Sequence, residues 1–426
     1  MPICSLSNPG THARNEVDMH PHSLFSVVGI EIEYMLVDCE TLAVKPVSDR
    51  VLQTLGNGVL DNEIDLGDIA VSNELVLHVL ELKNSAPCSP ASPIARHFQE
   101  ALEALKEPLD RLGCRLLPGG AHPLMNPLTE TRRWPHGNRD IYLQYDTIFD
   151  CRGHGWSNLQ SMHVNLPYAG DEEFCRLHSA IRLILPLLPA LAASTPFLDG
   201  KNTGFHDARL AVYATNQQKI PSITGGVIPD FSPNPRAYTR DILTPMYADI
   251  SPYDPKGILQ HSWLNSRGVI PKFDCNALEI RILDTQECVA ADIGIAEFVF
   301  CLLKHLVDTC PMLTENPPQT ARLRAVYEDT IRDGLNAEIH DTSLFEHWGV
   351  NGCHPVSARE VLSHWFDAIA PQLSSDGRNA IARILQHGNL AERLLRVCGQ
   401  TPSREALHAA CATLADCLAG NRPFLP

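Results

Sequence analysis

Three separate segments of the chain alternate ionisable or polar side chains with large apolar ones, with a period of two residues. The segments are GIEIEYMLVD, SMHVNLP and ALEIRILD. Because successive side chains of a β-strand point to opposite faces, each segment predicts a strand with one apolar and one polar face. If the three strands join one sheet, its polar face gathers the following side chains: Glu31, Glu33, His163, Asn165, Glu279 and Arg281.

A solvated face of an antiparallel sheet shows the same alternation, and for any one strand this is the simpler interpretation. An ordinary wet face prefers threonine, lysine and serine, however, whereas these strands carry residue types that ligate metal ions. Taken together, the three strands therefore favour a binding or catalytic surface.

A fourth segment, ELVLHVLELK, predicts a strand over Glu74–Leu82. Between Glu74 and Glu81 it is apolar on both faces apart from His78, which we interpret as a buried core histidine. An ionised carboxylate at the end of such a run is costly unless it is paired or bound to a cation. The seven-residue separation places the two glutamates on opposite faces of a regular strand. They can converge only through a bulge or bend, or else they serve different sites.

The remaining pattern predicts an α+β chain. Strands are expected at Val27–Val37, Ser161–Leu166 and Ala277–Leu283, and helices at Ser92–Leu112, Glu172–Leu185 and Glu287–Val307. Beyond about Asn316, after a Pro-rich stretch, the spacing of apolar residues is helical and strand character is slight. Helices are expected there at Ala321–Leu335, Ser357–Leu373, Gly388–Val397 and Ser403–Leu418. We therefore predict a loose polar arm (1–23), a catalytic domain (24–315) and a helical C-terminal portion packed on it (316–426).

Two loop regions carry residues that suit ligand binding. Phe197–Tyr253 is rich in Gly, Pro, Asn, Asp and Thr, and long irregular segments inside a compact chain are more often binding loops than linkers. Arg132, Arg133, Arg139 and Tyr142 form a cationic cluster in the sequence. They are either solvated loop residues or a clamp for a carboxylate.

Charge and apolar content exclude several classes of protein. Lys plus Arg total 34 and Asp plus Glu total 50, which argues against binding to nucleic acid or anionic lipid. The longest uncharged stretch, LILPLLPALAASTPFL, contains prolines and is shorter than the roughly 20 residues that span a bilayer. The N-terminal residues lack the apolar core of a signal peptide. The 14 cysteines include no C-x-x-C pair, which favours reduced thiols in a cytoplasmic protein over a zinc site or disulfides.

Several carboxylates with one histidine form a hard, oxygen-rich ligand set, which suits Mg²⁺ or Mn²⁺ better than zinc or copper. Arg281 beside Glu279 supplies a planar cation for phosphate or carboxylate. Magnesium with arginine is the usual equipment for phosphoryl transfer from a nucleotide. The chain has neither a G-x-x-x-x-G-K-[ST] loop nor a G-x-G-x-x-G after a strand. Metal ions and side chains would therefore have to hold the phosphates.

Five segments in this order resemble the glutamate–cysteine ligase family, in particular its bacterial carboxylate–amine ligase branch. They are GIEIEYMLVD, ELVLHVLEL, SMHVNLP, STPFLDGKNTGFHDAR and ALEIRILDTQ, and the resemblance runs from about Val27 to Leu306. It implies a glutamine-synthetase-like fold, in which a curved antiparallel sheet forms a funnel with flanking helices. It also implies that the γ-carboxylate of glutamate takes the γ-phosphoryl of ATP. The acyl phosphate is then attacked by an amine, which in the parent enzymes is that of cysteine.

The resemblance also implies roles for single residues. Arg281 would lie on the transferred phosphoryl, and Arg209 would be a second phosphate or substrate arginine. Asn165 and Asn216 would be polar contacts of the nucleotide. The residues facing Mg²⁺ (or Mn²⁺) would be Glu31, Glu33, Glu74, Glu81, His163 and Glu279.

The chain departs from the family pattern in two places. LKNSAP follows Glu81 where the family often has a Thr-Pro turn, and the segment between Leu124 and Asn158 has no residue-by-residue match. The second departure leaves the amine acceptor open.

Three functions follow as hypotheses. The first is an ATP- and magnesium-dependent ligase that joins glutamate to an amine such as cysteine, as in glutathione biosynthesis. The second is a metal-dependent hydrolase that uses the same carboxylates without ATP, although a hydrolase needs no cation on a γ-phosphoryl. The third is a non-catalytic metabolite sensor, which would be expected to have lost a ligand carboxylate, whereas none is missing here. The sequence leaves the oligomeric state open, and a homo-oligomer is one option.

Overall fold

The computed structural model describes residues 21–310, 312–350 and 354–425, so most of the predicted polar arm lies outside the described residues. Its centre is an antiparallel sheet of eight strands in the order β2-β3-β4-β1-β6-β10-β9, with β5 beside the second half of β1. The strands are β1 (Gly29–Asp38), β2 (Glu63–Asp65), β3 (Ile69–Asn73), β4 (Val79–Asn84), β5 (Cys114–Leu117), β6 (Ser161–Pro167), β9 (Val269–Lys272) and β10 (Ala277–Asp284). Two small two-stranded antiparallel sheets are also present. One pairs β7 (Phe197–Leu198) with β8 (Lys201–Asn202), and the other pairs β11 (Glu338–Ile339) with β12 (Val356–Ser357).

Helices surround this sheet. Those that precede residue 310 are α1 (Ser48–Leu55), α2 (Ile94–Leu112), α3 (Pro127–Glu130), α4 (Arg139–Phe149), α5 (His154–Ser157), α6 (Gly170–Ile184), α7 (Leu188–Ala192), α8 (Ala208–Tyr213), α9 (Pro235–Tyr238), α10 (Thr244–Ile250) and α11 (Val289–Thr309). Those that follow are α12 (Met312–Glu315), α13 (Thr320–Asp333), α14 (Phe345–Trp348), α15 (Ala358–Ile369), α16 (Ser375–His387), α17 (Leu390–Cys398) and α18 (Arg404–Ala419).

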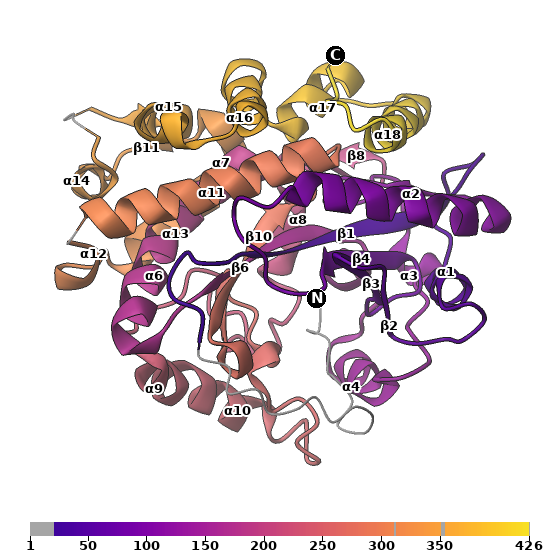
Figure 1. Cartoon of the computed structure of the whole chain (residues 1–426), viewed down its shortest axis with the longest axis horizontal. Helices are drawn as coiled ribbons and strands as arrows, with labels where there is room; N and C mark the ends of the chain where they lie inside the picture. Colours follow the sequence, from indigo (N-terminus) through magenta and orange to yellow (C-terminus); the bar gives the residue numbers. More distant parts are fainter. Residues whose placement is uncertain (1–20, 311, 351–353, 426) are drawn as a thin grey trace.

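The longest helices lie in layers on one side of the sheet, whereas α4, α9 and α10 lie on the other side (Figure 1). The long helices α2 and α11 cross its upper side, and α15 to α18 lie above them, as Figure 1 shows. The apolar face of the sheet meets this layer, and Ile32 of β1 and Val164 of β6 are completely buried in one core with Phe98 of α2 and Phe298 of α11. Burial of each such side chain contributes about 1.5–3 kcal/mol. The opposite face carries polar groups along the first half of β1, whereas Met35 and Val37 at its end belong to a second apolar cluster.

Three of the four predicted strands are confirmed as β1, β6 and β10, and the fourth is wrong. Instead of one strand over Glu74–Leu82, β3 ends at Asn73 and β4 begins at Val79, so that Glu74 and the next four residues form the connection of a hairpin. This connection pairs with a distant segment, because Trp134 N donates to Leu75 O (2.9 Å) and Leu77 N donates to Arg132 O (2.8 Å). A tertiary contact therefore holds a turn that contains no glycine or proline.

Strand β10 contains a β-bulge that changes which side chains share a face. Its register against β6 shifts between Ile280 and Leu283, so that Leu283 pairs with Met162 and Asp284 with Ser161. A bulge inserts one extra residue and reverses the alternation beyond it. Asp284 consequently lies on the polar face with Glu279 and Arg281, where strict alternation would have put it on the apolar face.

The predicted helices are confirmed as α2, α6, α11, α13, α15, α17 and α18. Residues of α15 and α16 belong to the same apolar core as the sheet, and α17 and α18 pack on Met35 and Val37 at the end of β1. The division of the chain at residue 316 stays a prediction. Among the described residues one helical stretch, Gly170–Ala192, has the length and hydropathy of a membrane span, but 89% of it is buried in the fold like a core helix. The described cysteines are all free thiols.

Candidate active site

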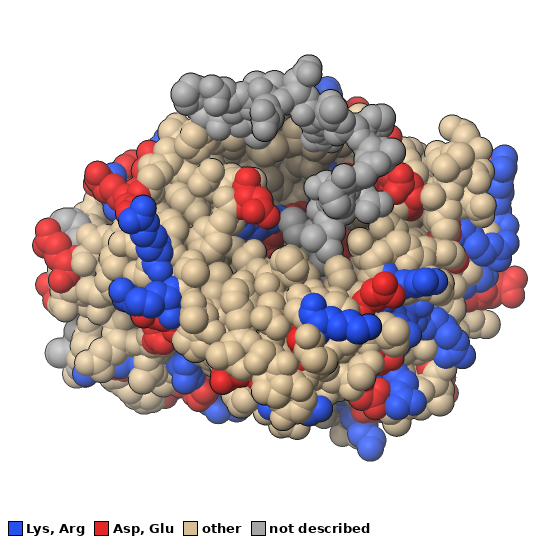
Figure 2. Space-filling view, turned by 90° about the horizontal axis from the view of Figure 1, so that it is seen from below, with Lys and Arg blue, Asp and Glu red and all other residues tan. Residues whose placement is uncertain are grey.

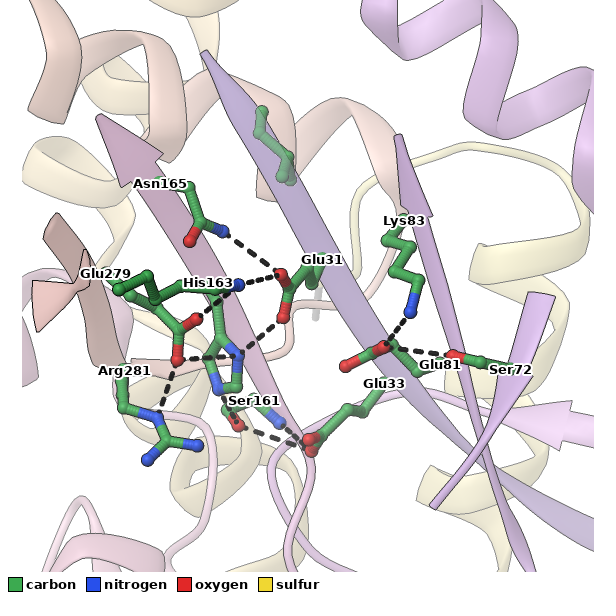
Figure 3. Close-up of polar contacts among 12 residues, drawn as sticks. Glu31, Glu33, Ser72, Glu81, Lys83, Ser161, His163, Asn165, Glu279 and Arg281 are labelled. Carbon is green, nitrogen blue, oxygen red and sulfur yellow. Dashed lines mark hydrogen bonds and ion pairs between the residues drawn. The ribbon is translucent and has the colours of Figure 1, made fainter. Parts of the chain in front are cut away.

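Six of the predicted site residues lie in two neighbouring groups on the polar face of the sheet. Figure 3 shows all of them except Glu74. The carboxylate–histidine trio consists of Glu31 of β1, His163 of β6 and Glu279 of β10. The glutamate trio consists of Glu33 of β1 with the two hairpin residues Glu74 and Glu81. Within each trio one ligand atom per residue lies within 4.8 Å of the others, and all six residues are buried. The solvated-face interpretation is therefore wrong for these strands.

Sheet register accounts for both trios. Glu31 pairs directly with His163, and Glu33 pairs directly with Glu81. The β3–β4 hairpin then returns the chain so that Glu74 joins Glu81. The bend that the seven-residue separation required is thus the turn between two antiparallel strands. Seen from below the sheet, the molecule is hollowed, and acidic and basic side chains lie inside the hollow (Figure 2).

The carboxylate–histidine trio is balanced by cations of the chain itself. Glu31 accepts from His163 Nδ1 (3.2 Å), Asn165 Nδ2 (3.1 Å) and Lys272 Nζ (3.2 Å). Glu279 pairs with Arg281 Nε (2.8 Å) and Lys272 Nζ (2.9 Å). Burial alone would raise the pKa of both carboxyls. Lys272 with His163 outweighs burial at Glu31, and Lys272 with Arg281 outweighs it at Glu279, so both pKa values lie below the ordinary range.

The glutamate trio is poor in positive charge. Glu33 Oε2 accepts from the backbone N–H (2.7 Å) and hydroxyl (3.2 Å) of Ser161, and Glu81 Oε1 accepts from Ser72 Oγ (3.0 Å) and pairs with Lys83 Nζ (3.3 Å). Burial, with Glu31 and Glu33 nearby, raises the pKa of Glu81 to about 7 despite Lys83. Burial and the charges of Glu81 and Glu33 raise the pKa of Glu74 well above its usual range.

The residues of the glutamate trio fit a divalent cation. Glu33 Oε1 and Glu81 Oε2 are buried, and neither has a hydrogen-bond partner in the described part of the chain. A buried carboxylate oxygen without a partner is costly unless a cation binds it. Because all the ligand atoms are oxygens, Mg²⁺ or Mn²⁺ suits the group better than zinc or copper.

Without metal, the free energy of unfolding should fall by about 3 kcal/mol as the pH rises from 4.5 to 7. In the unfolded chain Glu81 ionises near pH 4.5, whereas in the fold its pKa is about 7. This contribution to stability is therefore complete below pH 4.5 and is lost as the pH rises through 7. Urea unfolding in EDTA across this range measures it, and added Mg²⁺ should stabilise the protein increasingly with pH. If the free energy of unfolding falls equally steeply with pH in the Glu81→Gln variant, Glu81 is not the group responsible.

The two predicted arginines differ in their surroundings. Arg281 is 3% exposed and, besides its ion pair with Glu279, donates from Nη1 to the Asn265 carbonyl (3.3 Å). The ion pair of Arg281 with Glu279 is therefore buried, not exposed at the surface. Arg209, at the start of α8, pairs with Asp284, which also accepts from Ser194 Oγ (3.0 Å). Asp284 lies beyond the bulge on the polar face of β10, the strand that also carries Arg281, so it anchors Arg209 of α8 next to the site.

The remaining predicted residues are placed as follows. Asn165 lies in the site, where it donates to Glu31. Asn216 donates to the Gly155 carbonyl of α5 (2.7 Å), so its amide group binds backbone rather than a carboxylate of either trio. His78 is fully buried and its Nε2 lies 2.6 Å from the Ser157 carbonyl, and burial lowers its pKa to about 4. It is the core histidine that the sequence predicted.

The arginines of the predicted cationic cluster point to separate partners. Arg132 donates to backbone carbonyls, Arg133 pairs with Asp146 and the exposed Arg139 pairs with Asp140. They form no common carboxylate clamp with one another. Tyr142 of α4 does reach the site, since its hydroxyl accepts from Asn73 Nδ2 (3.0 Å) beside Glu74.

Several functional contacts escape sequence reasoning. Lys272 closes the strand VIPK, and Pro271 within it obscures the strand, because proline is tolerated only at sheet edges and bulges. Lys83, in contrast, follows Glu81 at period two, so the sequence alone could have placed it on the same face of the strand as Glu81. Ser161 also precedes His163 at that period, and its hydroxyl lies 2.9 Å from His163 Nε2 and 3.2 Å from Glu33 Oε2. Ser161 thereby links the two trios.

Comparison with known proteins adds three kinds of finding. The model of the glutamate–cysteine ligase family 2 (GCS2) matches residues 27–413. An uncharacterised protein of Archaeoglobus fulgidus is 31% identical over 94% of this chain and 100% of its own length. A Corynebacterium glutamicum protein provisionally named glutamate–cysteine ligase 2 is 25% identical over 91% of this chain and 96% of its own.

Two solved structures share the fold. Glutamate–cysteine ligase of Francisella tularensis, in complex with AMP, superposes with a TM-score of 0.64 at 13% identity, over 92% of this chain and 89% of its own. A bifunctional glutathione synthetase of Pasteurella multocida superposes with a TM-score of 0.57 at 13% identity, over 93% of this chain and 53% of its own. At such low identity these matches establish the fold alone. They agree with the curved antiparallel sheet and flanking helices predicted from the sequence.

Proposed function

The chain belongs to glutamate–cysteine ligase family 2, and on that premise we propose that it is an ATP-dependent ligase that joins the γ-carboxylate of glutamate to an amine. One observation carries the proposal most directly. The polar face of the sheet combines a buried group of three glutamates, whose negative charge exceeds that of the one lysine paired with it, with a buried arginine, Arg281, held in place by Glu279. Magnesium bound to phosphates beside a fixed guanidinium is the arrangement that phosphoryl transfer requires.

The reaction has two steps. The γ-phosphoryl of ATP passes to the γ-carboxylate of glutamate, which yields an acyl phosphate and ADP. The amine nitrogen then attacks the acyl carbon, the carbon–oxygen bond to phosphate breaks, and the amine loses a proton as the amide forms. A bound divalent cation would supply charge neutralisation at the phosphates.

The chain's own residues have distinct roles in this proposal. Glu33, Glu74 and Glu81 would hold one divalent cation, and Glu31, His163 and Glu279 on the neighbouring strands would hold another together with the phosphates. Arg281 donates hydrogen bonds to the phosphoryl in flight, and Glu279 aligns its guanidinium through Nε. Arg209, anchored by Asp284, supports the same region as a positioning residue.

The two alternatives have less support. A metal-dependent hydrolase has no use for a buried arginine beside the carboxylates, whereas Arg281 is fixed there by two contacts. A non-catalytic sensor has no need of the complete carboxylate set, and both trios are assembled here.

We expect ADP release only when glutamate, ATP, Mg²⁺ and a suitable amine are all present, because the acyl phosphate needs an acceptor to turn over. The assay couples ADP release to amide detection by mass spectrometry across a panel of amines that includes cysteine. One ADP should appear for each amide formed. Hydrolysis of a γ-glutamyl amide without nucleotide would favour the hydrolase, and nucleotide binding without turnover on any amine would favour the sensor.

A further inference from the structure

The two trios differ in charge balance. In the carboxylate–histidine trio, two carboxylates face the two cations Lys272 and Arg281, so the group is neutral when His163 is neutral. In the glutamate trio, three carboxylates have one lysine beside them, Lys83, which pairs with Glu81 (3.3 Å) and more closely with Glu63 outside the trio (2.8 Å). At least two negative charges therefore remain when all three carboxylates are ionised. One divalent cation would neutralise the glutamate trio. The other trio already has its counter-ions.

Lys272 lies where a bridging cation would lie. Its Nζ is 3.2 Å from Glu31 Oε1 and 2.9 Å from Glu279 Oε2, so it joins carboxylates from two different strands. It pairs across the β9–β10 ladder with Ala277, so its side chain lies on the same face of the sheet as that of Glu279. An ammonium and a divalent ion cannot share this position, because like charges a few ångströms apart repel strongly in a buried site.

A cavity next to Lys272 gives its ammonium somewhere else to go. The cavity has a volume of about 150 Å³ and is lined by Glu31, Lys83, Asn165 and Lys272, among others. The side chain of Lys272 is 16% exposed, and a lysine stem is flexible. An anion that enters this cavity meets two lysines at the edge of the carboxylate face.

We propose that Lys272 is a built-in counter-ion that excludes a divalent cation from Glu31, His163 and Glu279 until the phosphates of a nucleotide draw its ammonium away. The glutamate trio then loads first and alone, and the carboxylate–histidine trio accepts its metal only together with nucleotide. This inference rests on the proposed function, because it assumes that the face binds metal and polyphosphate. It assigns to Lys272 a positioning role that couples metal occupancy to nucleotide binding.

Counting bound Mn²⁺ by electron paramagnetic resonance tests the proposal on the full chain. The unmodified protein should bind one Mn²⁺ without nucleotide and at least one more with a non-hydrolysable ATP analogue. Lys272→Gln should bind two without nucleotide, the second at least about 100-fold more tightly than in the unmodified chain. Lys272→Met, which keeps the length of the side chain, repeats this test if the glutamine variant does not fold.

Two further variants serve as matched controls. Lys272→Arg keeps the charge and should restore a count of one ion. Lys83→Gln removes the same charge from the same face but at Glu81, so it should tighten the first ion without adding a second. Two ions in the unmodified protein without nucleotide, or only one in both neutral Lys272 variants, would overturn the role of Lys272 alone. No Mn²⁺ binding in any variant, with or without nucleotide, would overturn the proposed function itself.

Discussion

Replacing Arg281 by lysine is expected to lower kcat at least about 100-fold while changing the KM for ATP far less. The phosphoryl group in flight carries charge spread over its oxygens, and a guanidinium matches it with paired donors, whereas an ammonium keeps only the charge. A contact that strengthens in the transition state affects kcat more than ground-state binding. Arginines in comparable positions contribute about 10³–10⁵ in rate, so a 100-fold loss is a conservative expectation.

Steady-state kinetics with glutamate, ATP and the best amine measure this effect, and thermal unfolding measures stability in parallel. Arg393→Lys is a matched control, because Arg393 forms a similarly buried ion pair with Glu287 (Nη1–Oε1, 2.6 Å) away from the trios. The Arg393→Lys variant should unfold at a lower temperature, but its kcat per folded molecule should be unchanged. A nearly normal kcat in Arg281→Lys would show that the guanidinium serves only as a structural partner of Glu279.

Replacing Glu279 by glutamine should lower turnover by about 10²–10³-fold, because it removes a charge that aligns Arg281 and contributes to the metal-facing set. The substitution should also lower stability. Glu279 is 3% exposed and pairs with both Lys272 and Arg281, and breaking a buried pair costs about 3–5 kcal/mol. The variant should therefore be less stable as well as inactive.

Glu287→Gln separates the two effects. Glu287 is equally buried and pairs with Arg393 at two positions (2.6 and 3.2 Å), so its loss should lower the melting temperature comparably. Its activity per folded molecule should stay near normal. If Glu279→Gln, corrected for its folded fraction, works within a few fold of the unmodified enzyme, Glu279 belongs to the framework rather than to the site.

Alternation along the strands was sufficient to predict most of the sheet's polar face. Glu31 and Glu33 share a face because period two is a property of every strand, and no tertiary information is needed. That His163 joins them depends on the pairing of β1 with β6. The same argument placed Glu279 and Arg281 together. Their burial could not be predicted in this way, because alternation shows which face of the sheet a side chain lies on but not which segments of the chain cover that face.

Strict alternation along the strands did not predict two local irregularities of the sheet. The turn after Glu74 is held by backbone bonds to the segment around Arg132, so the run ELVLHVLEL contains no local signal for a turn. The bulge in β10 likewise leaves no mark in ILD, yet it moves Asp284 to the polar face and lets it anchor Arg209. Both features come from pairing with remote residues, which a single sequence does not display.

Lys272 was missed for a related reason. It lies 241 residues from Glu31, and its strand is only four residues long with a proline inside. The sequence around Lys272 does not indicate an ion-pair partner, whereas the acidic residues can be recognised because they recur at every second position of a strand. Cations that neutralise an acidic face are therefore harder to predict than the face itself.

The order of the strands gives the site a gradient of mobility. Strand β1 lies inside the sheet, between β4 on one side and β6 and β5 on the other, whereas β9 is an edge strand with β10 as its one strand neighbour in the described sheet. Local opening of a native protein begins where few ladders hold the backbone. Amide protons of β1 should be exchanged with solvent only on global unfolding, and those of β9 by fraying at much lower cost. Glu31 and Glu33 thus lie on a strand whose amide protons should exchange slowly, whereas Lys272, whose ammonium pairs with Glu31 and Glu279, lies on an edge strand that should open far more often.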